Sequence, residues 1–197
     1  NKNGLFNIIG NINDNDDKIG TKHYLFADAE IHNQLGEIDV YMQNSNSDTY
    51  MKRNQINELD FLTSGINISN TINGNDFSFE AKAYKHLAVL DDNQWEYLYP
   101  KFSYNIFNLK VPFLDENIDL KNEVLRTKNL DKEIVTSISS EANINQQKIN
   151  LRNGLVFNNF FDNRVIYHSL ESDNSKNDLN QIRIFPQIGS KISMPLT

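Results

Sequence analysis

Apolar and polar residues alternate with a period of two along most of this chain. The clearest run places Phe77, Phe79, Ala81 and Ala83 in alternation with Ser78, Glu80, Lys82 and Tyr84. The same alternation recurs around residues 100–106, 134–144 and 182–194, whereas helical spacing is nowhere sustained. Because successive side chains of a β-strand point to opposite faces, the pattern predicts an all-β fold whose strands have one apolar and one polar face.

The alternation predicts about ten strands, which we expect to pair with their sequence neighbours as an antiparallel meander. They cover residues 5–12, 23–33, 37–43, 61–72, 76–84, 97–108, 118–126, 133–145, 148–159 and 181–194. Many of them have about ten residues, although strands of soluble domains more often have about five or six. A tilted strand that crosses a bilayer needs about nine to eleven residues. The lengths therefore favour an open, curved segment of a large transmembrane β-barrel.

Short and long connections between the predicted strands roughly alternate. Asn73 and Gly74 indicate a two-residue hairpin, because both positions of such a turn need positive φ. The short connections are residues 34–36, 73–75 and 145–147, and the long ones are residues 13–22, 44–60, 85–96 and 160–180. Outer-membrane barrels have short periplasmic turns and long external loops. We therefore expect the short connections at the periplasmic end and the long ones at the extracellular end.

In such a barrel the apolar face of each strand contacts lipid and the polar face lines the lumen. We therefore expect a convex, lipid-facing set of Phe77, Phe79, Ala81, Ala83, Ile134, Ile138, Ala142 and Ile144. The expected lumen-facing set is Ser78, Glu80, Lys82, Ser137, Ser139 and Glu141. Trp95, Tyr97 and Tyr99 stand at alternate positions, which fits either an aromatic girdle at a membrane interface or an aromatic ladder in a soluble sheet.

Length, charge and cysteine content narrow the class of protein. The 197 residues suffice for one domain, and a net charge of −7 without a stripe of Lys and Arg argues against a nucleic-acid partner. The absence of cysteine excludes disulfides and thiolate metal sites, and no apolar run approaches the length of a membrane helix. The chain lacks an initiator Met and stops within an alternating pattern. We therefore interpret residues 1–197 as one partial domain, a fragment of an outer-membrane β-barrel.

Residues suited to catalysis or metal binding do not cluster in the sequence. His23, His32, His86 and His168 are far apart, and none forms a metal-ligand pair on one helix or strand face. The acidic run at residues 14–17 does not continue as a calcium loop. Glycine-rich phosphate loops and nucleophile elbows are absent. We expect a protein that is not an enzyme and has no catalytic residue, cofactor or metal site.

A basic pair, Lys52 and Arg53, stands in the polar loop at residues 47–64. One interpretation is a contact to an anionic group such as a lipid phosphate. The other is a solvated pair that forms ion pairs with Glu58 or Asp60. Exposed ion pairs are common and contribute little to stability, which favours the second interpretation.

Several short motifs carry a resemblance to a known family. They are SDTYMKR at 47–53, DFLTS at 60–64, FSFEAKAY at 77–84, LYPKFSY at 98–104 and RIFPQ at 183–187. Their order and spacing resemble the middle part of the barrel domain in the family of the LPS-assembly outer-membrane protein LptD, also named organic solvent tolerance protein. Tyr99 departs from the family pattern, because it stands between Leu98 and Pro100 where the family has Leu-Pro.

The resemblance implies a barrel wall that serves lipopolysaccharide (LPS) transport in Gram-negative cell envelope biogenesis. The family passes LPS from a periplasmic bridge into the outer leaflet of the outer membrane, and a small lipoprotein plugs the barrel. The implied partners are LPS, outer-membrane lipid, the plug lipoprotein and the periplasmic LPS bridge. The implied location is the cell outer membrane. Lys52 and Arg53 are then candidate contacts to LPS phosphates.

Two other interpretations use the same strands. One is a different outer-membrane channel or receptor barrel, and the other is a soluble periplasmic β-sandwich that binds a ligand. A sandwich consists of two packed sheets with Greek-key connections. The order and layering of the strands therefore distinguish it from a barrel segment.

Overall fold

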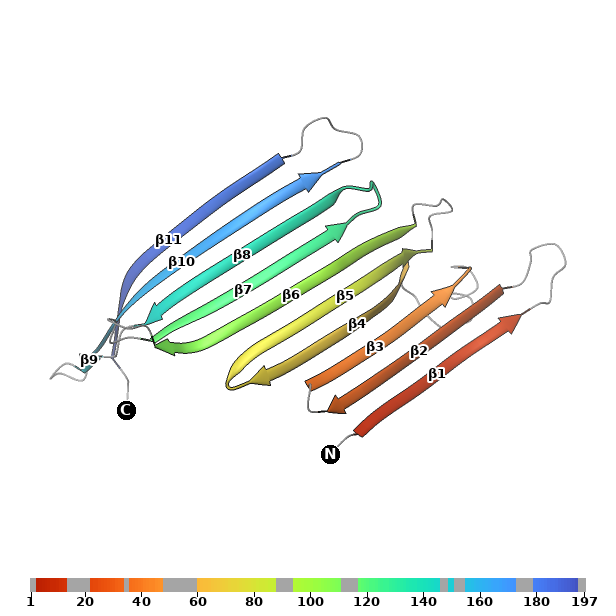
Figure 1. The fold of residues 1–197 in the computed structure, drawn as a ribbon, viewed down its shortest axis with the longest axis horizontal. Helices are drawn as coiled ribbons and strands as arrows, with labels where there is room; N and C mark the ends of the chain where they lie inside the picture. Colours follow the sequence, from red (N-terminus) through yellow and green to blue (C-terminus); the bar gives the residue numbers. More distant parts are fainter. Residues whose placement is uncertain are drawn as a thin grey trace.

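The computed structural model describes residues 3–13, 22–33, 36–47, 60–87, 94–110, 117–145, 149–150, 155–172 and 179–194. These ranges contain no helix, and hence none long and apolar enough to cross a membrane. The strands are β1 (Asn3–Asn13), β2 (Lys22–Asn33), β3 (Gly36–Ser45), β4 (Phe61–Ile72), β5 (Asn75–His86), β6 (Trp95–Lys110), β7 (Asn117–Lys128), β8 (Ile134–Asn145), β9 (Ile149–Asn150), β10 (Val156–Glu171) and β11 (Leu179–Ser193). Figure 1 shows them side by side.

The strands form one open antiparallel meander. Each strand from β1 to β8 pairs with its sequence neighbours, β8 then pairs with β10, and β10 pairs with β11. The two-residue β9 lies off this path and pairs only with the start of β10. Within the described ranges β1 pairs only with β2 and β11 only with β10, so the sheet does not close. The prediction of an all-β antiparallel meander with about ten long strands is confirmed.

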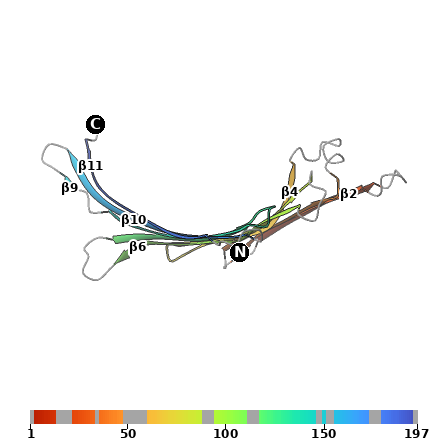
Figure 2. The same cartoon turned by 90° about the horizontal axis from the view of Figure 1, so that it is seen from above.

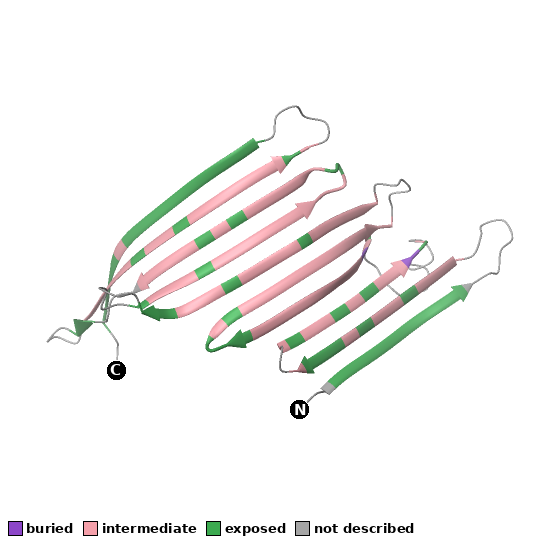
Figure 3. Cartoon of the chain, viewed as in Figure 1, coloured by how far each residue is buried: buried purple, intermediate pink, exposed green. Residues whose placement is uncertain are grey.

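The sheet is a single layer. Figure 2, which looks along the sheet, shows one thin and curved surface. Among the described residues only Leu62 and Ser45 are fully buried, and they lie where β4 begins and β3 ends. The two edge strands, β1 and β11, are exposed along most of their length (Figure 3). The described part of the chain therefore lacks the packed second layer around which soluble domains build a core.

Most predicted strand boundaries are confirmed, and one region is wrong. Nine predicted strands begin and end within two residues of an observed strand. The predicted strand at 148–159 and the predicted loop at 160–180 are wrong, because β10 runs through Val156–Glu171. The predicted hairpin at 145–147 is also wrong, since Asn145 at the end of β8 lies opposite Phe160 of β10. The first half of β10 mixes Asn with apolar residues on both faces, and Asn-rich stretches are typical of turns.

The connections alternate between the two ends of the sheet, but their lengths follow the expected pattern only in part. Residues 146–155 join β8 to β10 at the same end as the short turns, and the five residues 129–133 join β7 to β8 at the same end as the long loops. The links at residues 34–35 and 73–74 join strands at one end, termed here the short-turn end. The links at 14–21, 46–60, 87–94 and 172–178 join strands at the opposite end, termed the long-loop end. Asn73 and Gly74 have φ values of 53° and 79°, which confirms the predicted hairpin. The periplasmic and extracellular assignment of the two ends stays a prediction.

Gly65 allows three strands to approach closely at the centre of β4. It lies opposite Tyr41 of β3 and Lys82 of β5. A Cβ atom at this position would lie 2.6 Å from the carbonyl oxygen of Ala81 and 3.0 Å from the Tyr41 hydroxyl. The glycine therefore leaves room for the backbone of β5 and for the end of the Tyr41 side chain.

Gly65→Ala is expected to lower the free energy of unfolding by about 1–3 kcal/mol, because the added methyl group meets a backbone carbonyl that moves only with its strand. Asn67→Ala, two residues along the same strand, is the matched control and should change it by less than about 0.5 kcal/mol. The measurement is urea unfolding of the folded protein. Equal losses for both variants would contradict the close approach at Gly65.

Candidate functional site

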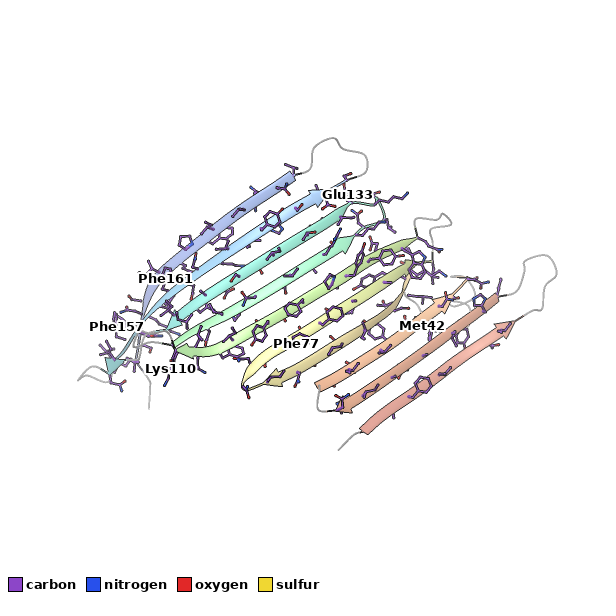
Figure 4. The ribbon with its side chains drawn as sticks, viewed as in Figure 1. Met42, Phe77, Lys110, Glu133, Phe157 and Phe161 are labelled. Carbon is purple, nitrogen blue, oxygen red and sulfur yellow. The ribbon has the colours of Figure 1, made fainter. Side chains whose placement is uncertain are left out.

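The strand register divides the side chains between two faces of the sheet. Directly opposed residues in antiparallel strands point to the same face. One face, termed the apolar face, carries in its central part Phe6, Ile8, Ala27, Ala29, Val40, Met42, Ile66, Ile68, Phe77, Phe79, Phe102, Tyr104, Leu120, Val124, Ile138, Ala142, Val165, Tyr167, Ile182 and Ile184. Figure 4 labels Met42, Phe77, Phe157 and Phe161, which belong to this face.

Both predicted sets of side chains keep to a single face. The set expected to face lipid, which begins with Phe77 and ends with Ile144, lies wholly on the apolar face. The set expected to face the lumen, from Ser78 to Glu141, lies wholly on the opposite face, termed the polar face. The separation of the two sets is therefore confirmed, and their lipid and lumen assignment stays a prediction.

Charged side chains occupy only one end of the apolar face. Within the described strands they are Lys85, Arg126, Lys128 and Glu171, all close to the long-loop end. The rest of this face is uncharged in the described strands. Its side chains are half-buried on most inner strands and exposed on the edge strands, where Ile184 and Ile188 of β11 are 62% and 83% exposed. Contiguous exposed apolar patches of this extent mark a surface that contacts another apolar phase or partner.

Aromatic rings line the apolar face along β6. The Trp95 and Tyr97 rings stack with centroids 6.3 Å apart, and Tyr99 meets Tyr97 edge-on at 5.7 Å. The Lys85 Nζ atom lies 5.6 Å from the centre of the Trp95 ring. The long-loop end of the apolar face thus combines aromatic rings with cations.

The polar face carries a belt of paired charges. Lys82 contacts Glu80 on β5. The nearest charged atoms are 3.8 Å apart between Lys101 and Glu123, and 3.6 Å apart between Lys121 and Glu141. Arg164 of β10 lies directly opposite Glu141. Each exposed pair adds little stability, but together they make this face hydrophilic across the sheet.

Two hollows lie mainly on the polar face. One of about 400 Å³ is lined by Glu141, Asp162, Arg164, Ile166, Phe185 and Gln187. Another of about 520 Å³ near the short-turn end has Glu37, Asp76, Ser78, Ser103 and Asn105 among its lining residues. Charged and amide groups of this kind suit water and polar ligands better than acyl chains.

Strands β3 and β4 diverge toward the long-loop end. Their ladder joins residues 37–41 to residues 65–69 and then stops. Beyond it, the Ser64 hydroxyl accepts a hydrogen bond from the Gln43 amide at 3.0 Å and donates to the Gln43 carbonyl at 3.2 Å. The Gln43 side-chain oxygen accepts a hydrogen bond from the Thr63 amide at 3.0 Å. Side chains therefore replace the missing backbone pairs.

A group of exposed side chains at the β2–β3 hairpin could hold a cation. Ligand atoms of Glu30, His32 and Glu37 lie within 4.8 Å of one another. His32 lies opposite Glu37, and its Nε2 atom is 2.7 Å from a Glu30 carboxylate oxygen. Carboxylate and imidazole ligands suit divalent transition metals. The prediction of no metal site weighed the spacing of the histidines, the acidic run at 14–17 and the absence of cysteine, but not this combination of one histidine with two glutamates. The two-residue link at 34–35 is the signal that places Glu37 beside His32.

The sequence-predicted phosphate contact, Lys52 and Arg53, lies outside the described residues and stays a prediction. The expectation that the chain is not an enzyme also stays a prediction. A scan against protein-family models gives no match, and a search of curated proteins gives none. The function is therefore argued from the two faces of the sheet and from the sequence motifs.

Proposed function

We propose that this chain is part of the wall of an outer-membrane β-barrel that transports LPS and inserts it into the outer leaflet. The observation that carries the proposal is the apolar face, which spans ten long strands of a single-layer sheet and in these strands carries charge only near one end. The wall of a barrel suits such a sheet. Lipid would cover its apolar face, water in the lumen would hydrate its polar face, and neighbouring strands would pair with the backbone N–H and C=O groups.

Burial energetics favour lipid over exposure to water. Fully burying one large aliphatic or aromatic side chain contributes about 1.5–3 kcal/mol relative to leaving it exposed. Side chains such as Ile184 and Ile188 are more than half exposed in the isolated sheet. A soluble sandwich would cover them with a second sheet reached by Greek-key connections. The described strands form one meander instead, which disfavours the sandwich.

Strand length matches the thickness of a bilayer. Strands β2, β4, β5, β7 and β8 each have 12 residues. At a rise of about 3.3 Å per residue and a tilt of about 40°, twelve residues span about 30 Å along the membrane normal. The hydrocarbon core of a typical bilayer is about 30 Å thick. A shorter sheet, with strands of about five residues, would not cross it.

The sequence motifs support LPS as the cargo. FSFEAKAY lies within β5, LYPKFSY within β6 and RIFPQ within β11, while DFLTS ends in the first residues of β4. These four motifs thus fall on a strand or a strand start, as the resemblance to the LptD barrel implies, while SDTYMKR at 47–53 lies almost wholly outside the described residues. The complete protein would reside in the cell outer membrane of a Gram-negative bacterium. Its partners would be LPS, outer-membrane lipid, a plug lipoprotein and a periplasmic LPS bridge.

A different outer-membrane channel or receptor is the second candidate. The belt of paired charges on the polar face fits this candidate as well as the LPS-transporting barrel, because a water-filled lumen is polar whatever the barrel transports. The two candidates differ in what reaches the cell surface.

Depletion of the protein is expected to stop delivery of newly made LPS to the cell surface, because the barrel is the final step of that route. The measurement is pulse-labelled LPS that a membrane-impermeant reagent reaches on intact cells. Depletion of an unrelated outer-membrane porin is the control. Unchanged delivery of LPS to the surface would contradict LPS as the cargo, but it would not contradict the proposal of a barrel wall.

Ala81→Arg is expected to impair insertion of the reconstituted protein into lipid vesicles much more than Ser78→Arg. Ala81 lies on the apolar face of β5 and Ser78 on its polar face. A lipid-facing Arg near the bilayer centre costs about 2–4 kcal/mol. The measurement is the fraction of protein that becomes protease-resistant in vesicles. Equal loss for the two variants would count against a lipid-facing apolar face.

The topology prediction uses a chain that contains no native cysteine. Asn46→Cys lies at the long-loop end and Asn73→Cys at the short-turn end. On intact cells, an impermeant maleimide should label Asn46→Cys and should reach Asn73→Cys only after permeabilisation, because the long connections face outward. The reverse pattern would invert the orientation of the sheet.

A further inference from the structure

We propose that the long-loop end of the apolar face binds LPS phosphates from the surrounding leaflet through Lys85, Arg126 and Lys128, a set termed the basic rim. The proposal rests on the proposed function, since it takes the apolar face as the lipid-facing one. It adds a lipid-binding site on the outside of the wall, separate from any route through the lumen.

The basic rim is assembled around β6 by strand register. Lys85 of β5 lies opposite Trp95, and Lys128 of β7 lies opposite Tyr97. Arg126 stands two residues before Lys128 and so points to the same face. Adjacent strands are about 4.8 Å apart, so β5 and β7 lie about 10 Å apart on either side of the aromatic row. One phosphorylated disaccharide headgroup can span that separation.

The charges of the basic rim are uncompensated within the described part of the chain. Lys85 Nζ donates to Asn44 Oδ1 at 3.0 Å and to the Ser45 carbonyl at 2.8 Å. Both acceptors are neutral, so they fix the ammonium group without cancelling its charge, and one donor remains. Arg126 Nε is buried and has no hydrogen-bond partner among the described residues.

The polar face provides the contrast. There Lys82, Lys101 and Lys121 each have a carboxylate partner. The salt bridges among the described residues include none to the basic rim. In the described strands the apolar face has one acidic residue, Glu171, which stands on β10, two strands away from Lys128. An external anion is therefore needed to satisfy the rim, because unpaired charge next to an apolar surface is costly.

The neighbourhood selects a lipid phosphate as that anion. Trp95 and Tyr97 stack beside the cations, and such aromatic residues sit at the level of lipid headgroups. Arg binds phosphate through two parallel hydrogen bonds, and basic residues at a membrane surface attract anionic lipids. Below the rim the apolar face is uncharged, which suits acyl chains. The ligand is therefore a phosphorylated glycolipid with its headgroup at the long-loop end.

Tyr99 and Tyr104 offer two reporter positions on the apolar face. Leu98 lies opposite Thr127 and Lys101 opposite Leu125, so Tyr99 falls in the gap opposite Arg126. Tyr104 lies nearer the middle of the strand, and both side chains are exposed, at 40% and 37%. A photoreactive residue at Tyr99 would report on the basic rim, and one at Tyr104 on general contact with lipid.

The experiment reconstitutes the complete barrel that carries this chain in phosphatidylcholine vesicles that contain LPS or enzymatically dephosphorylated LPS. At Tyr99, light-induced capture of LPS is expected to be at least about tenfold stronger with phosphates present, since charge-assisted hydrogen bonds are lost without them. Arg126→Gln combined with Lys128→Gln should lower it by a similar factor. Lys121→Gln, on the polar face of the same strand, should leave it unchanged.

Each result identifies which proposal fails. One outcome is that the probe at position 104 captures lipid, while capture at position 99 changes neither with the phosphates nor with the Arg126 and Lys128 substitutions. That outcome would overturn the basic rim and leave the barrel proposal intact. If Tyr104 captures no lipid at all, the apolar face does not face the bilayer, and the proposed function falls together with the rim. Equal loss of capture with Lys121→Gln would overturn the rim as a local site.

Discussion

Hydrogen bonding between neighbouring strands fixes the register on which both faces of this sheet depend. Because side chains alternate with a period of two, a slip of one residue would move every apolar side chain of a strand to the other face. The irregularity in β6 shows how the register is kept. Glu80 lies opposite Lys101, but three residues along β6 then match two along β5, so that Lys82 lies opposite Leu98. Without this bulge Trp95 and Tyr97 would point to the polar face, away from Lys85 and Lys128.

Local sequence was sufficient wherever alternation and turn chemistry agreed. In β5 the alternation of Phe77 to Ala83 and the turn at Asn73 and Gly74 both specify the same strand, and the predicted boundaries are confirmed. β10 lacks that agreement, since its first half places Asn and Phe on both faces. Its strand conformation depends on pairing with β8 and β11 along its two edges. Such tertiary pairing overrides weak local preference, and a single sequence does not display it.

The candidate sites differ in how far sequence could have revealed them. Glu30, His32 and Glu37 are joined by a two-residue link, so hairpin geometry alone brings them together. The basic rim is different, because its cations come from strands that flank β6 and meet only through two registers and a bulge. Lys52 and Arg53 are adjacent in sequence, but they lie outside the described residues, so their phosphate contact stays a prediction. Adjacency along the chain is a poor guide to clustering on a sheet, where neighbours lie across strands.

The placement of charge on the apolar face bears on the kind of membrane. In the described strands its short-turn end has no cation, whereas its long-loop end has Lys85, Arg126 and Lys128. A bilayer with identical leaflets offers no reason for that asymmetry. A bilayer with a phosphate-rich glycolipid in one leaflet does, because cations then gain ionic partners at one interface only. The basic rim therefore supports residence in an asymmetric outer membrane whichever cargo the barrel carries. Under the proposed function the cargo would meet the polar face instead, with its belt of paired charges from Glu80 to Arg164.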